Sequence, residues 1–540
     1  MKIILAALPL SLAALAGAHK HSSGHSSHRY RHHRASGVLQ ASSGTTTCIV
    51  DESGVGQDST PKIMDAFTKC QKNAKRAGPS AGDADTYPPP LRQIVLNGNY
   101  LVKSLLYTPM LYNVEIELTG TRKFLHISEI AMGSVLNMVL SPVTYSDDIA
   151  YWSKPTTDTH GDGSYELYYQ NVTTFFFLQG EKIWLHGSPT SKTSKAEKQS
   201  TFNGNGQKWW DQFVKDKKAG NLHGIESTEY ARPILLTIGN AKNVRVEYIN
   251  FLNGPFWNIF ITHSKQVTMS NINIDAVSKS DSLPYNTDGV DTYNSDDVTL
   301  LDFNVNNADD CVSLKPNSTN VEVGRVNCNG SHGISVGSLG QYVDSYDIWE
   351  SCIEWVGHIH QVENVYIHDI SMSNAQAGAR IKAWPDRNGT AKDAGGGSGY
   401  VKNITFQNFV NKNVDEPLLI TSCYMNSNEY CTKFPSKMTV SDVHYINVTG
   451  TSSGKYKDVV ALLDCSKECT GITAIGTHLS LPTPSTPPVY NCHNVDSEKQ
   501  LDFHCTELLL ESTKIPNDQQ RRTAGPGLAP GSLPFIELTN

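Results

Sequence analysis

The sequence has little charge and no excess of positive charge. Only 18% of its 540 residues are charged, and 45 Lys and Arg against 53 Asp and Glu give a net charge of −8. A general nucleic-acid-binding protein would usually be basic, so that class is excluded. With 39% hydrophobic residues, the chain is also too apolar and too weakly charged to be a disordered protein.

The sequence also lacks a long apolar run beyond its first residues. Lys2 precedes an almost unbroken apolar stretch from Ile3 to Ala16, and Ala16-Gly17-Ala18 fits a small-residue cleavage site. A membrane anchor is the alternative, but the stretch is too short to span a bilayer comfortably. Residues 1–18 are therefore predicted to be a cleaved signal peptide of a secreted, extracellular protein that is not held in a membrane.

Two features of the chain take their meaning from secretion. Residues 19–45 form a His-rich leader that we expect to be disordered, with metal binding as the alternative. Asn-x-Ser/Thr sites become N-glycosylation candidates, and they lie at Asn171, Asn317, Asn329, Asn388, Asn403 and Asn447. The 11 cysteines become disulfide candidates, and their odd number leaves at least one thiol unpaired.

Apolar residues recur at the same offsets along the middle of the chain. The pattern of Val244, Val246, Ile249 and Phe251 returns in segments that begin at Val267, Val298, Val321, Val365 and, more weakly, Ile404. The starts are 23, 31, 23, 44 and 39 residues apart. Alternation within each unit is typical of a β-strand, and the change of phase indicates a bend, often beside Asn or Asp.

Such a unit can bury its apolar side only by stacking on the next unit. This is the logic of a solenoid, and an ordinary β-sandwich does not repeat one offset pattern in this way. The sequence therefore predicts an all-β protein, a single-stranded right-handed parallel β-helix that covers residues 46–515. We expect residues 516–540 to be an irregular C-terminal tail.

Four short stretches that carry reactive side chains fall on successive coils. Asp288 and Asp309 are 21 residues apart, and Asp310 and His332 are 22 residues apart. Neighbouring parallel strands lie about 4.8 Å apart, so these side chains should meet on one face. Crowded carboxylates should raise at least one carboxyl pKa, and one protonated acid beside ionised carboxylates can cleave a glycosidic bond.

Two other interpretations of these residues remain open. Asp and Asn commonly cap turns, and a carboxylate cluster also suits calcium, which would make the protein a pectate lyase. His332 argues against calcium, which prefers oxygen ligands, so we predict no metal and no cofactor. Arg380 and Lys382 are two residues apart and share one strand face; two cations aimed at an acidic site indicate an anionic substrate group.

These motifs, in this order, resemble the polygalacturonase family of glycoside hydrolases. The similarity covers most of the chain from Cys48 to about Cys505 and includes the stretch Asn203–Asp211. The stretch Cys328–Tyr342 resembles the fungal exopolygalacturonases (galacturan 1,4-alpha-galacturonidases) most closely. The resemblance implies that Asp309 is the general acid and that Asp288 and Asp310 activate water, with inversion at the anomeric carbon.

The resemblance implies further roles for other residues. His332 would share a proton with the acid, while Arg380 and Lys382 would bind a galacturonate carboxylate and Tyr424 would contact substrate. Local cysteine pairs are Cys48/Cys70, Cys311/Cys328, Cys423/Cys431, Cys465/Cys469 and Cys492/Cys505, the second of which matches a disulfide of the family. The cysteine left over, Cys352, lies in Trp349–Gln361, a segment that departs from the family pattern.

The predicted function is hydrolysis of α-1,4-galacturonosidic bonds in pectin by a monomer whose partner is pectic polysaccharide. Exo action from the non-reducing end needs a wall across the binding path, for which Ala276–Tyr285 and Trp349–Gln361 are the candidates. The alternatives are an endo-polygalacturonase, a rhamnogalacturonan or xylogalacturonan hydrolase, and a non-catalytic β-helix that binds polysaccharide.

Overall fold

The computed structural model describes residues 46–71, 92–118, 143–187, 200–219, 231–343, 360–388, 394–483 and 486–507. The predicted signal peptide, His-rich leader and C-terminal tail lie outside these residues. So does the segment Trp349–Gln361, apart from its last two residues. In the part of the chain that is described, no helix is long and apolar enough to cross a membrane.

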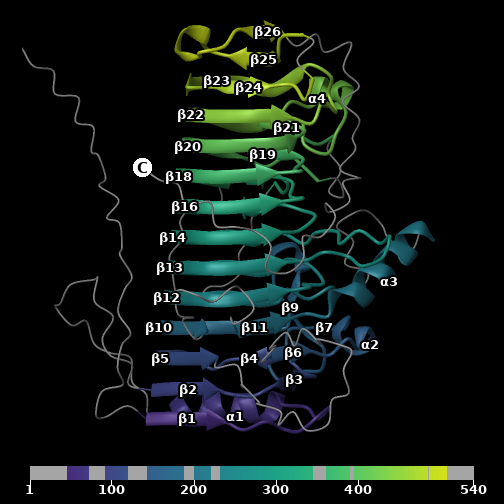
Figure 1. Ribbon diagram of the computed structural model, residues 1–540, viewed down its shortest axis with the longest axis vertical. Coiled ribbons are helices and arrows are strands. Elements are labelled where there is room, and N and C mark those ends of the chain that lie inside the picture. The colour runs from purple at the N-terminus through teal and green to yellow at the C-terminus, as the bar shows by residue number, and fades with distance from the viewer. Residues whose placement is uncertain are drawn as a thin grey trace, which may run out of the picture. The chain divides into compact units, whose positions relative to one another are not determined.

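Apart from β7 (Pro155–Thr156), β8 (Ser164–Glu166) and β9 (Thr173–Thr174), the described strands wind into stacked coils with parallel neighbours (Figure 1). One ladder runs through β1 (Thr46–Val50), β2 (Arg92–Leu96), β5 (Leu111–Leu118), β10 (Phe176–Gly187), β12 (Leu236–Leu252), β13 (Ile259–Asp275), β14 (Val290–Asn306), β16 (Ser318–Asn329), β18 (His360–Ser373), β20 (Ser398–Val414), β22 (Lys437–Ser452) and β23 (Val459–Ile475). This arrangement confirms the predicted parallel β-helix.

The register of this ladder is the one that the apolar repeat predicts. Val244 pairs with Val267, Val267 with Val298, Val298 with Val321, Val321 with Val365, and Val365 with Ile404. All of these side chains are buried, so equivalent positions stack into one continuous core. Coil lengths from 23 to 44 residues therefore leave the register of the described strands unchanged.

The predicted bend is present in each repeat. The residue between the second and third apolar positions has a left-handed backbone, with φ from 55° to 62° at Tyr248, Asn271, Asp302, Arg325, Asp369 and Asn408. Asn and Asp tolerate this conformation better than other residues with a side chain. Amides stack beside the core in the same way: the Asn273, Asn304 and Asn327 side chains each donate to the equivalent residue one coil earlier.

A second ladder carries the functional strands. It contains β15 (Val312–Leu314), β17 (Ile334–Leu339), β19 (Ala377–Ala383), β21 (Glu416–Thr421), the first part of β23, β25 (Val489–Val495) and β26 (Cys505–Glu507). The first residues of β12, β13 and β14 continue it toward the N-terminal coils. We call this ladder the site sheet.

The remaining elements cover ends and edges of the coils. The short strands are β3 (Tyr100–Val102), β4 (Leu106–Tyr107), β6 (Val143–Tyr145), β7 (Pro155–Thr156), β8 (Ser164–Glu166), β9 (Thr173–Thr174), β11 (Ser200–Asn203) and β24 (His478–Ser480). The helices are α1 (Thr60–Gln71), α2 (Ile149–Trp152), α3 (Gly206–Lys218) and α4 (Asn428–Lys433), with the 3-10 turns η1 (Tyr169–Asn171) and η3 (Glu498–Gln500). Helix α1 buries Ile63 and Phe67 against the first coils, where an open edge would otherwise invite pairing with another chain.

Disulfides join the cysteines as the sequence predicts. All five local pairs are bonded: Cys48–Cys70, Cys311–Cys328, Cys423–Cys431, Cys465–Cys469 and Cys492–Cys505. The pairing prediction is therefore confirmed for these ten residues, while Cys352 lies outside the described residues. Disulfides persist in oxidising compartments, which fits a secreted protein.

Candidate active site

Backbone hydrogen bonds between coils bring the four predicted motifs together. The Gly289 N–H donates to the Asp310 carbonyl at 2.9 Å, and the His332 N–H donates to the Asp309 carbonyl at 2.8 Å. The turns that precede β14, β15 and β17 are thus stacked directly on one another. Arg380 and Lys382 lie within β19, the next strand of the site sheet.

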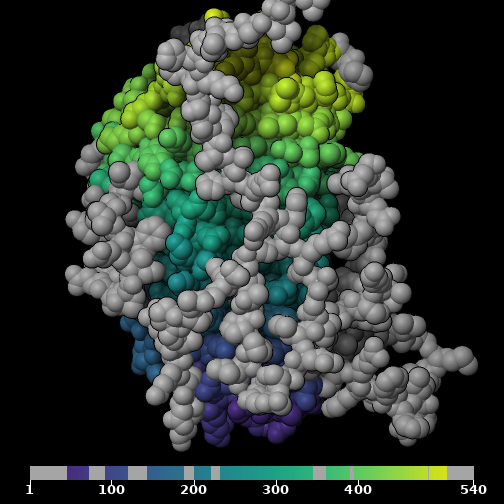
Figure 2. All heavy atoms as spheres, turned by 90° about the vertical axis from the view of Figure 1, so that its left-hand side faces the viewer, coloured from purple at the N-terminus to yellow at the C-terminus, as the bar shows by residue number. Residues whose placement is uncertain are grey.

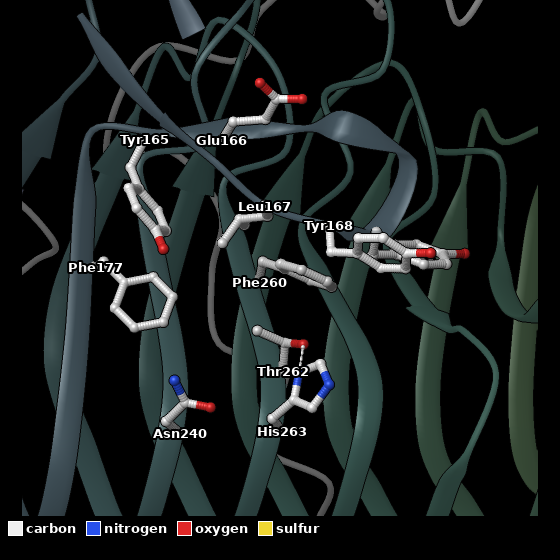
Figure 3. A pocket seen from close by; sticks show the side chains of 10 residues that line it. Tyr165, Glu166, Leu167, Tyr168, Phe177, Asn240, Phe260, Thr262 and His263 are labelled. Atoms are coloured by element: carbon white, nitrogen blue, oxygen red, sulfur yellow. Dashed lines mark hydrogen bonds between the residues drawn. The ribbon is translucent and has the colours of Figure 1, made fainter. Parts of the chain in front are cut away.

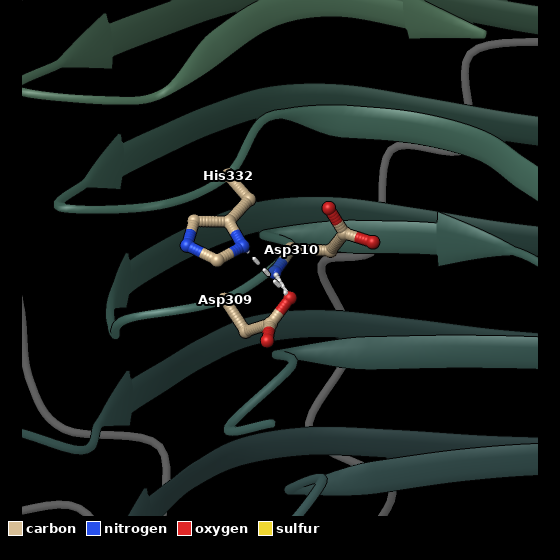
Figure 4. Close-up of side chains that lie close together, drawn as sticks. All are labelled: Asp309, Asp310 and His332. Atoms are coloured by element: carbon tan, nitrogen blue, oxygen red, sulfur yellow. Dashed lines mark hydrogen bonds and ion pairs between the residues drawn. The ribbon is translucent and has the colours of Figure 1, made fainter. Parts of the chain in front are cut away.

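Asp309 and His332 form the open part of the site (Figure 4). His332 Nδ1 lies 3.1 Å from Asp309 Oδ1, and the two side chains are 16% and 17% exposed. The Asp310 N–H donates to the same carboxyl oxygen at 2.8 Å. These contacts fix one oxygen of Asp309 and leave the other for a reacting group.

Asp310 lies deeper and is bound by permanent cations. Its side chain is fully buried, pairs with Lys382 Nζ, and lies 3.4 Å from an Nη1 of Arg380. The Ser335 hydroxyl donates to it at 2.8 Å. Burial opposes ionisation of this carboxyl, but Lys382 and Arg380 outweigh burial and lower its pKa.

The pKa of Asp309 is also lowered below its usual range. Burial alone would raise it, and the charge and hydrogen bond of His332, followed by the charge of Lys382, reverse that effect. The lowered pKa of Asp309 therefore depends on a proton held by His332. Because the two groups are in contact, this proton belongs to the Asp309–His332 pair rather than to one residue.

Two buried residues of the site escaped the sequence analysis. Asp291 on β14 is fully buried, and Lys315, directly after β15, has a side chain that is 7% exposed. Lys315 Nζ lies 3.2 Å from Asp291 Oδ1 and 3.8 Å from Asp288 Oδ2. In the sequence each is a single charged residue, in Val290-Asp291 and Val312-Ser-Leu-Lys315, and nothing there distinguishes it from an exposed residue.

The predicted rise of a carboxyl pKa occurs in this deeper pair. Burial, followed by the charges of Asp291 and Asp309, raises the pKa of Asp288 well above its ordinary value. Burial raises the pKa of Asp291 to about 7, although Lys315 opposes the shift. Four carboxyls thus face three permanent cations, Lys315, Arg380 and Lys382, so one further proton neutralises the cluster.

The turn that carries Asp288 is held by a buried arginine. Arg232 donates to the Tyr285 carbonyl at 2.6 Å and to Asn286 Oδ1 at 2.7 Å. Its guanidinium also lies 3.9 Å from the ring centre of Phe213 on α3. The loop Ala276–Tyr285, one of the two predicted walls, is therefore held against α3, which begins in the stretch Asn203–Asp211.

Tyr424 lies beside the two predicted substrate-binding cations. Its N–H donates to the Ala383 carbonyl at 3.0 Å. The centre of its ring lies 5.4 Å from Arg380 Cζ and 5.1 Å from Lys382 Nζ. The predicted trio of Arg380, Lys382 and Tyr424 therefore lies together, next to Asp310.

Asp309, Asp310 and His332 offer ligand atoms within 4.8 Å of one another, close enough to hold a metal ion. Both oxygens of Asp310, however, already face Lys382 or Arg380. A divalent cation would be repelled by these permanent charges, so the donor set fits a metal poorly.

The predicted glycosylation sites fall into two groups. Asn171 and Asn388 are exposed. The amides of the other four donate to a neighbouring coil: Asn317 to Asn294, Asn329 to Asn306, Asn403 to Asn364 and Asn447 to Asn408. Glycosylation itself stays a prediction for all six sites.

A parallel β-helix with carboxylates stacked beside an imidazole and buried cations defines a polysaccharide-cleaving glycosidase. The family model described as "Glycosyl hydrolases family 28" matches residues 166–501. The chain therefore belongs to this family. An exopolygalacturonase of Cochliobolus carbonum is 34% identical over 466 residues, which cover 85% of this chain and 86% of that protein. Exopolygalacturonase X of Aspergillus niger is 34% identical over 470 residues, or 86% and 89% of the two chains.

Solved structures agree with the fold. The endo-xylogalacturonan hydrolase of Aspergillus tubingensis aligns with a TM-score of 0.61 and 27% identity, covering 86% of this chain and 99% of that one. A polygalacturonase of Erwinia carotovora aligns with a TM-score of 0.51 at 17% identity, covering 85% and 99%, and supports the fold alone.

Proposed function

We propose that the protein is an exopolygalacturonase, which hydrolyses α-1,4-galacturonosidic bonds of homogalacturonan from the non-reducing end and releases galacturonic acid. The observation that carries the proposal is the stack of Asp288, Asp309 and Asp310 with His332, beside Arg380 and Lys382. Carboxylates and an imidazole supply proton transfer, while the cations suit a substrate that carries a carboxylate on each sugar.

In the proposed reaction, one water molecule replaces the leaving sugar with inversion. Asp309 donates a proton to the glycosidic oxygen as the bond from the anomeric carbon to that oxygen breaks. A water on the opposite side attacks the anomeric carbon and gives its proton to Asp288 or Asp310. The proton then passes from the deeper carboxyl by way of His332 to Asp309, which restores the general acid.

The directions of the pKa shifts indicate which groups carry a proton before the reaction begins. The acid proton is shared by Asp309 and His332, which lie 3.1 Å apart, and an approaching glycosidic oxygen draws it to Asp309. Asp310 is ionised, because Lys382 and Arg380 lower its pKa. Asp288, whose pKa is raised, has the greater affinity of the two for the proton that the attacking water releases.

Arg380 retains a donor for the substrate. Its Nη1 is engaged by Asp310 and by the His332 carbonyl at 3.2 Å, whereas its buried Nε has no hydrogen-bond partner among the described residues. A shift of the Arg380 side chain would bring Nε into contact with a galacturonate carboxylate beside Tyr424.

Exo action is supported by the relatives that match most of this chain, because they are named exopolygalacturonases. A second candidate is xylogalacturonan hydrolysis, favoured by the similarity to the Aspergillus tubingensis enzyme. We further propose that the protein is secreted after removal of residues 1–18 and acts outside the cell as a monomer, with pectic polysaccharide as its partner and neither nucleic acid nor a membrane bound.

Product analysis on three substrates tests these proposals. The purified protein should release only galacturonic acid from de-esterified oligogalacturonates, with little loss of viscosity from the polymer. Mixed oligomers would contradict exo action, and preferential release from xylose-substituted polymer would favour the second candidate. No new reducing ends on any substrate would contradict hydrolysis, and products that absorb in the ultraviolet would indicate a lyase.

A further inference from the structure

A small hairpin covers the N-terminal end of the site sheet. Strands β8 and β9 pair in antiparallel fashion, and Tyr168–Asn171 form the tip between them. The Leu167 N–H donates to the Val172 carbonyl at 2.7 Å and closes the base of the tip. We call residues 164–174 the cap hairpin.

The tip packs on the outward face of the site sheet through Tyr169. The Tyr169 ring stacks on that of Tyr293, with centroids 4.0 Å apart, and lies 6.1 Å from Phe260. All three rings are nearly excluded from solvent, whereas the neighbouring Tyr168 is 49% exposed. Figure 3 shows Tyr165 and Leu167 of the hairpin above Phe177 and Phe260 of the coils.

The strand register relates this contact to the catalytic residues. Phe260, Asp291, Ser313, Ser335 and Arg380 are successive partners across the site sheet and form one row. Because Asp291 and Arg380 of this row belong to the ion pairs of the site, we expect a polysaccharide bound at the site to cross the coils along it. The cap hairpin occupies the row at Phe260, one strand beyond Asp291, where the path would continue toward the N-terminal coils.

The cap hairpin is anchored at both ends of its span. The Gln170 amide donates to Gln341 Oε1, 171 residues away beyond β17, at 2.8 Å. At the base, the Ile234 N–H donates to the Thr173 carbonyl at 2.7 Å, and the Phe175 N–H donates to the Ile234 carbonyl at 2.9 Å. Contacts to three different coils fix the hairpin more firmly than its short strands could.

The tip also lies next to the buried cation of the site. Lys315 Nζ lies 4.9 Å from the ring centre of Trp257, and that ring centre is 6.4 Å from the ring centre of Tyr169. The hairpin therefore ends the binding path at the catalytic cluster itself rather than at a distant coil.

We propose that Tyr169, held in place by the tip of the cap hairpin, is the wall that makes the enzyme exo-acting and is its specificity-determining residue. This inference rests on the proposed galacturonan hydrolysis. The loop Ala276–Tyr285 and the segment Trp349–Gln361 stay candidates for other boundaries of the site. The wall that ends the binding path is assigned instead to the cap hairpin, which the sequence does not indicate.

The test is to shorten the tip without disturbing its strands. Tyr168–Asn171 is replaced by Asn-Gly, a dipeptide that closes a two-residue hairpin. This exposes Tyr293 and Phe260, whose ring faces can then pack against another sugar. We expect the variant to release dimers and longer oligomers from polygalacturonate, and to lower viscosity more per bond cleaved than the wild-type protein does.

Controls separate the possible causes. Tyr168→Ala alters the exposed residue of the same tip, and Asn171→Gln removes the glycosylation candidate there; both should keep the wild-type products. Tyr169→Ala should give oligomers as the shortened tip does. If the folded shortened variant still releases monomer alone, the wall lies elsewhere. If the wild-type protein itself releases oligomers, the exo function fails, independently of this test.

Discussion

Lys315 Nζ lies 3.2 Å from Asp291 Oδ1 and 3.8 Å from Asp288 Oδ2 in the buried floor of the site. Both oxygens of Asp291 lack any other hydrogen-bond partner among the described residues. The ammonium is therefore the main compensation for a carboxyl that is fully removed from water, directly below the catalytic carboxylates.

Lys315→Met should destabilise the protein strongly at pH 7. Loss of one partner of a buried pair costs about 3–5 kcal/mol, and guanidinium unfolding would measure the change. Lys265→Met is the matched control, because Lys265 pairs with Asp296 at 2.7 Å but is half exposed, and should cost about 0–1 kcal/mol. The double variant Lys315→Met/Asp291→Asn should recover part of the loss. Equal effects of the two single lysine variants would contradict this account.

The raised pKa of Asp291 predicts a pH-dependent stability. Since folding raises this pKa from 3.8 to about 7, the folded protein binds the proton more tightly than the unfolded chain does. The resulting stabilisation is complete below about pH 4 and is lost as the pH rises to about 7. Asp291→Asn should remove this contribution, so the difference in unfolding free energy between wild type and variant should change across that range. A constant difference would be inconsistent with the shift.

Asp309→Asn should abolish most turnover while the fold survives. The amide cannot supply the proton, and general acid catalysis contributes roughly 10²–10⁴-fold. Reducing-end release from oligogalacturonate measures turnover, and circular dichroism measures the fold. Asp302→Asn, which removes a surface carboxylate paired with Arg325, should leave turnover unchanged. A fully active Asp309→Asn protein would remove Asp309 from the acid role.

Chelation should leave activity unchanged. Lys382 and Arg380 already occupy the carboxylate of Asp310, so the site has no need of a divalent cation. Product release after exhaustive treatment with EDTA, and again after addition of calcium, would check this. Activity that disappears with EDTA and returns with calcium would favour the alternative reading as a calcium-dependent lyase.

Glycans should be found on Asn171 and Asn388 and be absent from Asn317. The first two side chains are exposed, whereas Asn317 is 9% exposed and its amide donates to Asn294 at 2.7 Å. A sugar attached to that nitrogen would have to break the bond and enter the coil stack. Peptide mass spectrometry of the secreted protein can assign each site, and a glycan on Asn317 in folded protein would disprove the argument.

Much of the fold was predictable because one rule repeats. Apolar residues at equal offsets must stack, so the repeat that runs from Val244 to Ile404 predicted the register of the strands. Cysteines close in sequence predicted the disulfides. Asp288, Asp309, Asp310 and His332 could be grouped because one coil separates them. Lys315 and Asp291 could not, since a charged residue in a short strand looks like an exposed one until the neighbouring coil buries it.

The cap hairpin was not predictable for a related reason. Its strands are two and three residues long, too short to produce a period. Its position depends on contacts such as Gln170 with Gln341, which lie 171 residues apart. Local sequence carries no record of such a contact.

The constant register of the coils separates substrate preference from the positions of the reacting groups. Coils as different as 23 and 44 residues keep Val298, Val321 and Val365 in register. A turn that carries none of the site residues can therefore be lengthened, shortened or replaced without changing the register of the strands. Substrate preference in this architecture is adjustable from the periphery, one turn at a time, while the chemistry stays where the core holds it.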